Sequence, residues 1–517
     1  MTEKRPICCG KPMKKSRGKS QSGNTRYQCG GKAGCGVSTT NLDGPKQTGY
    51  DQALADANYD YLIDAIKNGQ KKFVVTSAMN NTRLHTKQFE SLLKYCYYND
   101  ADLIVIPIHY KNVSAFTANE TFNKKWVQTV QPFILDKPLK LGGNVIVRAD
   151  IRIAATAANP LEGKQAINGR MWTIFGHSQF AMEPVATPAD QYPKRMYTTG
   201  CTTVRNYSQT NMGAKAEFHH VQGALVVEVV GRRAFVRQLN ANSDGCFYDL
   251  DKYYTPEDVT GGHRALALTT GDEHVKHHNK KVRKATYDAP DSITNVLKPK
   301  HIFRHDVLDA YFCSHHHEKD DIQQFRKYHM RDHNGRKELD DVVKFINETT
   351  PIFSTTHIVP SNHHDHLKMW LNRVDEKKDH ENAQLIYELK AQLKYNVLHG
   401  LTDDPLEIYL TPRLKCDFHF LDRSKPYVLK SVDYSQHGDK GINGARGSAR
   451  SFAKTVYQMV IGHSHGARIV KGTYQVGTSA NRMEYETGLG DHTHTHCIQY
   501  ANGKRTLIDI IGGRWHG

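Results

Sequence analysis

The sequence lacks any uncharged apolar run of about 18 residues, the length that a membrane-spanning helix needs. Its mean hydropathy is -0.63, so polar and charged residues dominate the chain. Its first residues are polar and basic, where a signal peptide would carry an apolar segment. The chain nevertheless has 517 residues, of which 38% are hydrophobic, enough for about two or three packed domains. We therefore expect a cytoplasmic protein that does not enter a membrane.

Acidic residues are scarce at the start of the chain, and histidines are scarce in its first half. Residues 1–50 contain ten lysines and arginines but only two acids, so this segment carries +8 of the formal charge of +17. Five of the 30 histidines precede residue 260, and the other 25 follow it. These shifts predict a basic module (1–50), an accessory domain (51–260) and a domain in which metal or proton chemistry should lie (261–517).

The basic module lacks the pair of Cys-x-x-Cys knuckles that is typical of zinc ribbons. Cys8 and Cys9 are adjacent, and five residues separate Cys29 from Cys35. Four thiolates can still complete a tetrahedral site, and the stretch between them resembles small zinc ribbons of transposase type. We predict a zinc-ribbon-like module whose four cysteines hold a structural Zn²⁺ ion; the alternative is a basic leader with reduced, unligated cysteines. Either form suits contact with a polyanion.

The accessory region has no glycine-rich phosphate-binding loop, and we assign it no chemistry. The stretches 71–77 and 101–107 are typical of buried strands, and 88–98 of an amphipathic helix, which together predict a β-α-β unit. An α/β accessory domain follows from this pattern. Further apolar strands are expected at 144–149, 172–176, 196–203 and 224–238, the last broken by a hairpin turn at 231–233.

Five times in the histidine-rich region, an apolar stretch is followed by residues that commonly bind metal ions. Alternation along an extended chain places Asp272 and His274 on one face, so that both can reach one ion. Such residues at five strand ends predict a metal centre. The candidates follow the stretches 265–268, 302–303, 356–360, 427–432 and 460–461 in this order: Asp272 and His274; Asp306 and Asp309; Asn362 and His363; His437; and His463 and His465.

The order of these motifs resembles that of the calcineurin-like metallophosphoesterases, which include the SbcD-type nucleases. The motifs read Asp-x-His, Asp-x-x-Asp, Asn-His, a single His, and Gly-His-x-His. The resemblance implies an αββα sandwich over 261–517, preceded by the accessory domain and the basic module. It also implies a hydrolase with two divalent metal ions. Two cations about 3.5–4 Å apart can clamp both oxygens of a displacement at phosphorus and activate a water, so no Ser or Cys nucleophile is required.

The same resemblance implies a role for each candidate. Asp306 would bridge the two ions, His363 would be the general acid for the leaving oxygen, and Asp309 would orient a ligand. Imidazole and carboxylate ligands suit Mn²⁺ first, with Mg²⁺, Fe²⁺ or Zn²⁺ as alternatives. The remaining six ligands divide between two sites: Asp272, His274 and His465 in the first, and Asn362, His437 and His463 in the second.

Two motifs depart from the family pattern. His305 and Ser361 stand where the family usually has glycines. The acid that normally follows the catalytic histidine is replaced by His364, which leaves Asp365 as the acid expected to steady His363. These departures spare all predicted metal ligands, so they affect the expected positioning of His363 more than the expected metal binding.

Three other groups allow both a functional and a plain structural interpretation. The stretch 315–317 is either a solvated loop or a substrate contact. The glycine-rich stretch 441–448 is either a simple turn or a contact for a phosphate backbone. The alternating residues His492, His494 and His496 form either one face of a strand or an additional metal site.

Charge and organisation favour nucleic acid, most simply DNA, as the substrate. The whole layout resembles the early host-DNA-degrading proteins of large tailed phages. It implies a metal-dependent DNase that acts on host DNA in the infected cytoplasm during host takeover, with a homo-oligomer as an option. One alternative is a phosphomonoesterase or small-nucleotide phosphodiesterase with the same ligands. Another is a non-catalytic DNA-binding takeover protein with structural metals.

Overall fold

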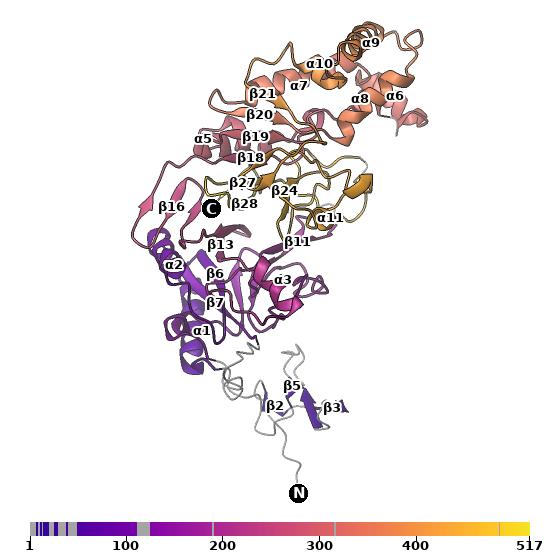
Figure 1. Cartoon of the computed structure of the whole chain (residues 1–517). Helices are drawn as coiled ribbons and strands as arrows, with labels where there is room; N and C mark the ends of the chain where they lie inside the picture. The colour runs from indigo at the N-terminus through magenta and orange to yellow at the C-terminus, as the bar shows by residue number, and fades with distance from the viewer. Residues whose placement is uncertain are drawn as a thin grey trace.

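The chain contains both helices and several β-sheets, and the fold is α/β, as the sequence pattern predicts (Figure 1). The computed structural model describes residues 49–110, 125–188, 191–314, 317–484 and 486–516. Before residue 49 it describes only the backbone of five short strands: β1 (Ile7–Cys8), β2 (Lys11–Pro12), β3 (Lys14–Lys19), β4 (Thr25–Gln28) and β5 (Ser38–Thr39).

The predicted zinc site of the basic module falls outside the part of the chain that is described. This applies to the side chain of Cys8 and to the whole of Cys9, Cys29 and Cys35. The zinc-ribbon-like module and its Zn²⁺ ion therefore stay predictions. The first two strands pair with each other, and the next three form a second small sheet.

The predicted β-α-β unit and hairpin of the accessory region are confirmed. β6 (Lys72–Met79) and β7 (Asp102–Ile108) run parallel, and α2 (Thr86–Asn99) lies between them in the chain. Seven of the eight residues of β6 are buried, as its apolar sequence requires. β13 (Gly223–Val230) and β14 (Arg233–Asn240) pair antiparallel and complete a sheet of order β14-β13-β6-β7.

A ten-stranded sheet crosses the domain boundary that the sequence predicts near residue 260. Its order is β22-β23-β24-β26-β25-β11-β12-β10-β9-β8, and β11 joins β25 antiparallel through the pair Met182 and Ile469. The accessory and histidine-rich regions therefore share one continuous sheet, which the sequence analysis did not anticipate. The strands are β8 (Pro138–Gly142), β9 (Val145–Arg148), β10 (Trp172–Phe175), β11 (Ala181–Val185), β12 (Lys194–Thr198), β22 (Val428–Leu429), β23 (Val432–Asp433), β24 (Gln458–Ile461), β25 (Arg468–Val470) and β26 (Thr473–Gln475).

A six-stranded sheet holds the other predicted strands of the histidine-rich region. Its order is β21-β20-β19-β18-β27-β28; the first four strands are parallel, and the last two pair antiparallel. Parallel strands place their carboxyl ends at one edge, which is where the predicted ligands follow. The strands are β18 (Ala267–Thr269), β19 (His301–Arg304), β20 (Thr355–Ile358), β21 (Phe418–Phe420), β27 (Thr495–Gln499) and β28 (Arg505–Asp509).

The described residues also include a small sheet and ten further α-helices. A small sheet consists of β15 (Phe247–Asp249), β16 (Lys252–Tyr254) and β17 (Val259–Thr260). The remaining helices are α1 (Gln52–Lys67), α3 (Asn211–His219), α4 (Lys280–Arg283), α5 (Ile293–Leu297), α6 (Asp321–Met330), α7 (Gly335–Thr349), α8 (Asn362–Arg373), α9 (Ala383–Leu398), α10 (Pro405–Leu410) and α11 (Ala449–Phe452).

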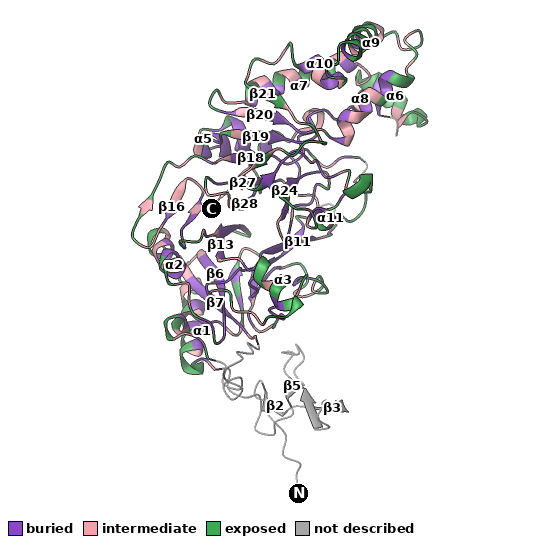
Figure 2. Cartoon of the chain, viewed as in Figure 1, coloured by how far each residue is buried: buried purple, intermediate pink, exposed green. Residues whose placement is uncertain are grey.

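Both faces of the six-stranded sheet are covered. Alternate residues of a strand point to opposite faces, so neighbouring residues of β27 and β28 pack on different sides. Cys497 and Leu507 pack into a core shared with the ten-stranded sheet. Their neighbours Ile498 and Ile508 pack on the opposite face, in a cluster that includes residues of α4 and α5. Buried residues follow the strands of the sheets, whereas α3 is largely exposed (Figure 2).

The ten-stranded sheet is covered in the same way near its β24 edge. Val460 belongs to the core shared by the two sheets, while Met459 and Ile461 pack with residues of α11 on the other side. Across the shared core, the rings of Phe303 and Tyr434 stack with their centroids 4.0 Å apart. Near this edge the layers are therefore helices, six-stranded sheet, ten-stranded sheet and the short helix α11, whereas Phe175 and Met196 farther along the ten-stranded sheet pack against Ile153 and Leu161, which lie outside helices.

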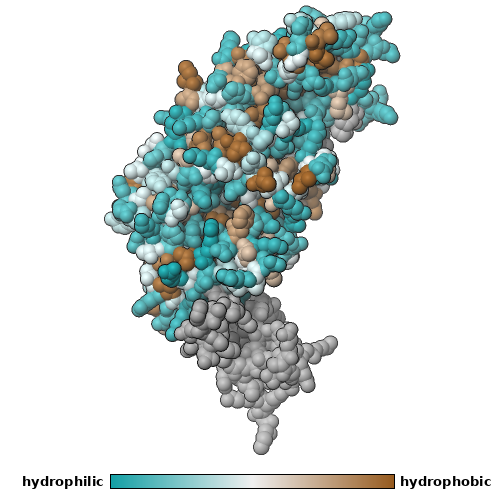
Figure 3. All heavy atoms as spheres, viewed as in Figure 1, coloured by the Kyte–Doolittle hydropathy of each residue, from teal (hydrophilic) through white to brown (hydrophobic). Residues whose placement is uncertain are grey.

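No helix in the described ranges is long and apolar enough to cross a membrane. The face shown in Figure 3 is mostly hydrophilic, and its hydrophobic side chains occur in small separate groups.

A buried ion pair ties the accessory region to the end of the chain. Arg195 of β12 and Asp509 of β28 approach to 2.6 Å between Nη1 and Oδ2, with side chains only 1% and 2% exposed. Thr495 accepts a hydrogen bond from Arg195 and donates one to Asp509. A charge removed from one side of such a pair leaves the other buried without a partner.

We expect Arg195→Ala to lower the free energy of unfolding by about 3–5 kcal/mol, since it leaves the Asp509 carboxylate unpaired in the core. Urea-induced unfolding followed by circular dichroism measures the change. The exposed Arg83 provides a control, and Arg83→Ala should stay within about 0.5 kcal/mol of the wild type. A change for Arg195→Ala as small as that of the control would contradict this role of the ion pair.

Candidate metal centre

The predicted ligand segments leave their strands through sharp turns. Four of the candidate residues have positive φ, a conformation that non-glycine residues rarely adopt. Such strain persists where surrounding structure enforces it, and it clusters at functional sites. The four residues are His274 (φ 39°), Asp306 (φ 44°), His463 (φ 75°) and His465 (φ 52°).

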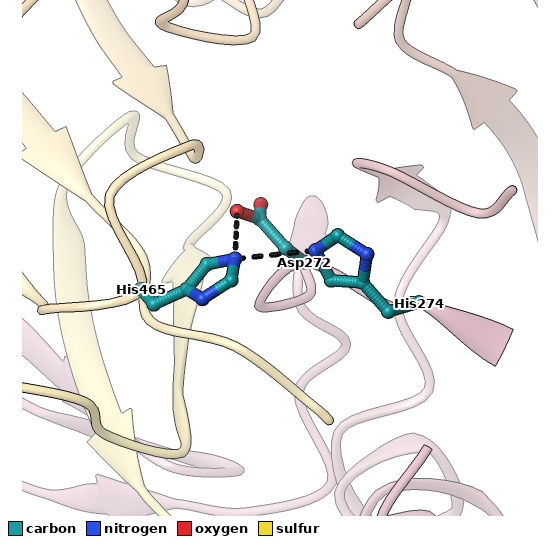
Figure 4. A group of neighbouring side chains, drawn as sticks. All are labelled: Asp272, His274 and His465. Carbon is teal, nitrogen blue, oxygen red and sulfur yellow. Dashed lines mark hydrogen bonds and ion pairs between the residues drawn. The ribbon is translucent and has the colours of Figure 1, made fainter. Parts of the chain in front are cut away.

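Asp272, His274 and His465 come together as the first predicted site requires (Figure 4). Each offers a ligand atom, and these atoms all lie within 4.8 Å of one another. Nε2 of His465 is 3.1 Å from Nε2 of His274 and 3.5 Å from Oδ2 of Asp272. All three side chains are buried. Two imidazoles and a carboxylate that face one another form a donor set for a divalent cation.

The Asp306 carboxylate lies between residues of the two predicted sites. Its Oδ2 atom is 3.7 Å from Nε2 of His274 and 3.0 Å from Nε2 of His437. A carboxylate that faces both groups is placed as a bridging ligand must be.

The second predicted site gathers around His437. The ring of His463 lies beside that of His437, with centroids 5.3 Å apart, and the His463 backbone N–H donates to Oδ2 of Asp272 at 2.8 Å. Asn362 is the first residue of α8, and Ser361 caps this helix by accepting from the N–H of His364. The structure thus brings His437 and His463 of the second site together with Asp306 and Asp272.

Buried polar atoms of the candidate residues and of their neighbours test whether a metal fits. Buried oxygen and nitrogen atoms normally have hydrogen-bond partners, so several orphans at one place need an explanation. The orphaned atoms combine carboxylate, amide and imidazole donors, which fits Mn²⁺, Fe²⁺ or Zn²⁺. Among the described residues, the atoms without a hydrogen-bond partner include Oδ1 of Asp272, Asp306 and Asn362, and Nε2 of His305 and His364.

The cluster has a strong internal field. Burial alone would raise the pKa of Asp306, but the charges of His437, His363 and His274 together with a hydrogen bond from His437 hold that pKa well below its usual range. Burial opposes protonation of His437, yet Asp306 and Asp272 raise its pKa to about 9. Burial also raises the pKa of Asp272, to about 6. The His437 ring therefore carries a proton that a bound metal ion has to displace.

Asp309 is placed where a ligand-orienting carboxylate is expected. Its Oδ1 atom lies 2.9 Å from Nδ1 of His274, which directs Nε2 of that ring toward the centre. Burial would raise the pKa of Asp309, but hydrogen bonding from His274 and His277 keeps it well below the usual value.

His363 is steadied by the chain around Asp309 and not by Asp365. Nδ1 of His363 lies 2.8 Å from the carbonyl oxygen of Asp309. The expectation that Asp365 steadies this ring is wrong. Asp365 accepts hydrogen bonds from Lys440 at 2.7 Å and Arg423 at 2.9 Å. Residues two apart on a helix do not face each other, and both residues lie in α8, so Asp365 points away from His363.

Sequence reasoning missed Glu486. Its Oε1 atom accepts from Nδ1 of His465 at 2.6 Å, and Nδ1 of His492 lies 3.2 Å from its other oxygen. A carboxylate that binds the second ring nitrogen fixes the orientation of a ligating histidine. Glu486 follows no predicted strand and belongs to no motif, so only the folded chain reveals it.

His305 is a second residue whose place the sequence did not indicate. Its Nδ1 atom lies 3.2 Å from Nδ1 of His437, and the two group with Asp272 as a further set of potential ligands. Burial, followed by the nearby His437, lowers the pKa of His305 well below its usual value.

A buried charge network underlies the first two ligand segments. Arg304 and Glu273 form an ion pair of 3.0 Å, and both side chains are fully buried. Tyr287 donates to Glu273 at 2.6 Å, and His278 lies 2.9 Å from it. Burial would raise the pKa of Glu273, but His278 and Arg304 lower it to about 2. Because Glu273 follows Asp272 and Arg304 precedes His305, this pair fixes two strand ends relative to each other.

The three alternating histidines near the end of the chain each have a different hydrogen-bond partner. His496 accepts from the backbone N–H of Gly271 at 2.9 Å, and His494 lies 3.0 Å from the carbonyl of Thr478. His492 joins Glu486, as described above. Residues 315 and 316 lie outside the described part of the chain.

These features define an α/β protein with a buried group of histidine and carboxylate side chains that can hold metal ions. The chain is 33% identical to Protein A1 of Escherichia phage T5 over 473 residues, which cover 87% of this chain and 83% of that protein. It therefore belongs to the family of that phage protein. No family model matches the chain, and no solved structure matches it. This identity confirms the expected relationship to a phage protein.

We expect the wild-type protein to bind Mn²⁺ and Asp306→Ala to bind it at least about 100-fold more weakly, because this carboxylate faces both groups of ligands. Calorimetric titration of metal-free protein with manganese chloride measures the affinity. Asp365→Ala is the matched control, since Asp365 pairs with Lys440 and Arg423 instead. Equal affinities for the wild type and Asp306→Ala would exclude Asp306 as a ligand.

Glu486→Gln should weaken Mn²⁺ binding by about 10- to 100-fold, because an amide holds the His465 ring less firmly than a carboxylate does. The same titration measures this loss. Glu484 lies two residues away, is exposed and pairs with Arg326, so Glu484→Gln should bind like the wild type. If both variants match the wild type, Glu486 does not orient His465.

Proposed function

We propose that this protein is a metal-dependent phosphodiesterase of the calcineurin-like metallophosphoesterase superfamily and that it acts as a DNase. One observation carries the proposal: candidate site residues from five separate strand ends, spread from residue 272 to residue 465 in the family order, lie in one largely buried cluster, with His363 representing the third strand end. The four-layer arrangement of helix, two sheets and helix supports the αββα sandwich that this superfamily implies.

Two divalent ions fit the donors of the cluster, with Mn²⁺ as the first choice. When bound, such ions polarise a phosphoryl oxygen and make a water acidic enough to act as the nucleophile. Asp306 would contact both ions. The other donors would be Asp272, His274 and His465 for the first ion, and Asn362, His437 and His463 for the second.

The proton chemistry rests on His363. An Nδ1–H that donates to the carbonyl of Asp309 leaves Nε2 of this ring to carry the exchangeable proton. His363 is only half-buried and lies beside His274, with ring centroids 4.8 Å apart, so it can reach a substrate held at the cluster. Protonation of the leaving oxygen by Nε2 is the role we assign to it. Asp309 positions both rings.

A basic hairpin beside His437 supports a nucleic-acid substrate. Lys440 and Arg446 pair across it, and Gly447 donates a backbone hydrogen bond to Asp439 at 2.9 Å. A Cβ atom on Gly447 would lie 1.9 Å from the carbonyl of Gly438, so the base of the hairpin packs directly against the residue after His437. Lys440 is paired with Asp365, so Arg446 is the exposed positive charge that the hairpin presents next to the cluster, where a phosphate backbone would pass.

The net charge of +17 and the basic module give the whole chain further affinity for a polyanion. The kinship with a phage protein supports a role in the takeover of a bacterial host. We accordingly propose that the enzyme degrades host DNA in the infected cytoplasm, with the four cysteines of the basic module holding a structural Zn²⁺ ion.

The nuclease activity is tested with supercoiled and linear plasmid DNA in the presence of MnCl₂. We expect the wild-type protein to cleave both, and His363→Ala to be about 10²- to 10⁴-fold slower, because the leaving oxygen loses its proton donor. His399→Ala is the control, since His399 is exposed at the end of α9. Agarose-gel time courses give the rates.

Three outcomes would overturn this proposal. If the wild-type protein is fully occupied by metal but does not cleave DNA, the remaining interpretation is a non-catalytic DNA-binding protein that the metal ions stabilise. Hydrolysis of a chromogenic phosphomonoester without plasmid cleavage would indicate a phosphomonoesterase. Equal rates for the wild type and His363→Ala would remove His363 from the chemistry.

A further inference from the structure

A small pocket lies where the β13–β14 hairpin meets the last turn of the chain. Its volume is about 250 Å³. None of its lining residues belongs to the metal cluster, so it is a separate site. The residues that line it are Val230, Arg232, Arg233, Phe235, Ile511, Gly512 and Arg514.

Three arginines of this pocket have no acidic partner. In the described part of the chain, Arg232, Arg233 and Arg514 form no ion pair, although many other surface arginines do. No acid is among the residues that line the pocket. Three guanidinium groups gathered around one cavity repel each other, and a bound anion would relieve this repulsion.

A second pocket of the protein shows the contrast. It is lined by Arg336 and Lys337 but also by Asp340, Asp341 and Glu381, so its charge is balanced within its own walls. The three-arginine pocket has no such balance. Its counter-charge has to come from a ligand or from solvent ions.

Tight turns hold the arginines in place. Arg232 and Gly231 (φ 59°) form the two-residue turn of the hairpin, and Arg233 pairs with Val230 directly after it. On the other side, Ile511 and Arg514 exchange two backbone hydrogen bonds of 2.8 and 3.3 Å. Backbones held in this way lose little freedom when an anion binds, which favours affinity.

Gly512 makes room for the guanidinium of Arg233. Gly512 has φ 63°, and a Cβ atom at this position would lie 1.9 Å from Nη1 of Arg233. The absence of a side chain thus allows the Arg233 guanidinium to lie against the backbone of the last turn. Any other residue would displace it.

Three of the residues that line the pocket are apolar. Phe235 and Ile511 are buried, and Val230 is half-buried beside them. Guanidinium groups bind phosphate oxygens through paired hydrogen bonds, and an apolar wall suits the sugar or base attached to the phosphate. We propose that this pocket binds the phosphate of a nucleotide, either free or within a DNA strand, at a site distinct from the metal cluster.

Binding is measured by calorimetry in EDTA with three probes: inorganic phosphate, dAMP and a short oligothymidylate. EDTA removes metal from the cluster, so the result does not depend on nuclease activity or on the proposed function. We expect the wild type to bind dAMP and Arg233→Ala to bind it about tenfold more weakly or worse, since a charge-assisted hydrogen bond is lost. Gly512→Ala should weaken binding as well, although it keeps all three charges. Arg83→Ala, an exposed arginine outside the pocket, should bind like the wild type.

The probes also identify the source of the phosphate. Tighter binding of the oligonucleotide than of dAMP, with the same loss in Arg233→Ala, supports a DNA strand as the ligand. Equal or tighter binding of dAMP supports a free nucleotide. The proposal is overturned if none of the probes binds, or if Arg233→Ala and Gly512→Ala both bind them as the wild type does.

Discussion

The contact between the Asp306 carboxylate and the His437 ring is the interaction on which the rest of the centre depends. Asp306 follows a strand of the six-stranded sheet, and His437 follows a strand of the ten-stranded sheet. Three residues before each of them, Phe303 of β19 and Tyr434, which directly follows β23, stack in the shared core. The apolar stack sets the distance and register of the two sheets, and the same spacing then carries two oppositely charged groups to within 3.0 Å of each other. Packing of the core thus determines the geometry of the cluster.

Bringing these groups together is costly, since burial disfavours every charged form in the cluster. The cost is offset by charges of opposite sign. Asp306 and Asp272 sit with His437, while Asp309 and Glu273 have partners of their own. Orphaned oxygen and nitrogen atoms nevertheless remain on Asp272, Asp306 and His305. The charges at the edge of the cluster are paired, whereas polar atoms in its middle have no partner. A bound cation would interact with these atoms.

The sequence predicts the features that are local. The β-α-β unit, the hairpin and the five strand ends follow from apolar periodicity, and the ligand types at those ends are visible in the chain itself. It could not predict features that arise from tertiary packing. The pairing of β11 with β25 joins residues far apart in the sequence, and nothing local distinguishes Glu486 from other surface acids. The partner of His363 was mistaken because the position at which α8 begins, and therefore the direction of Asp365, is set by the capping residue Ser361.

The strand pairing across residue 260 bears on how this chain evolved and how it can be divided. A piece that ended there would expose the edge of β11, and the remaining piece would expose the edge of β25. Unpaired, partly apolar edges of this kind recruit other chains and aggregate. The chain therefore cannot be divided at the compositional boundary without separating paired strands, although the boundary is the most visible change in the sequence. The abrupt rise in histidine content marks where the candidate metal ligands begin, whereas the folded unit that contains the ten-stranded sheet extends on both sides of residue 260.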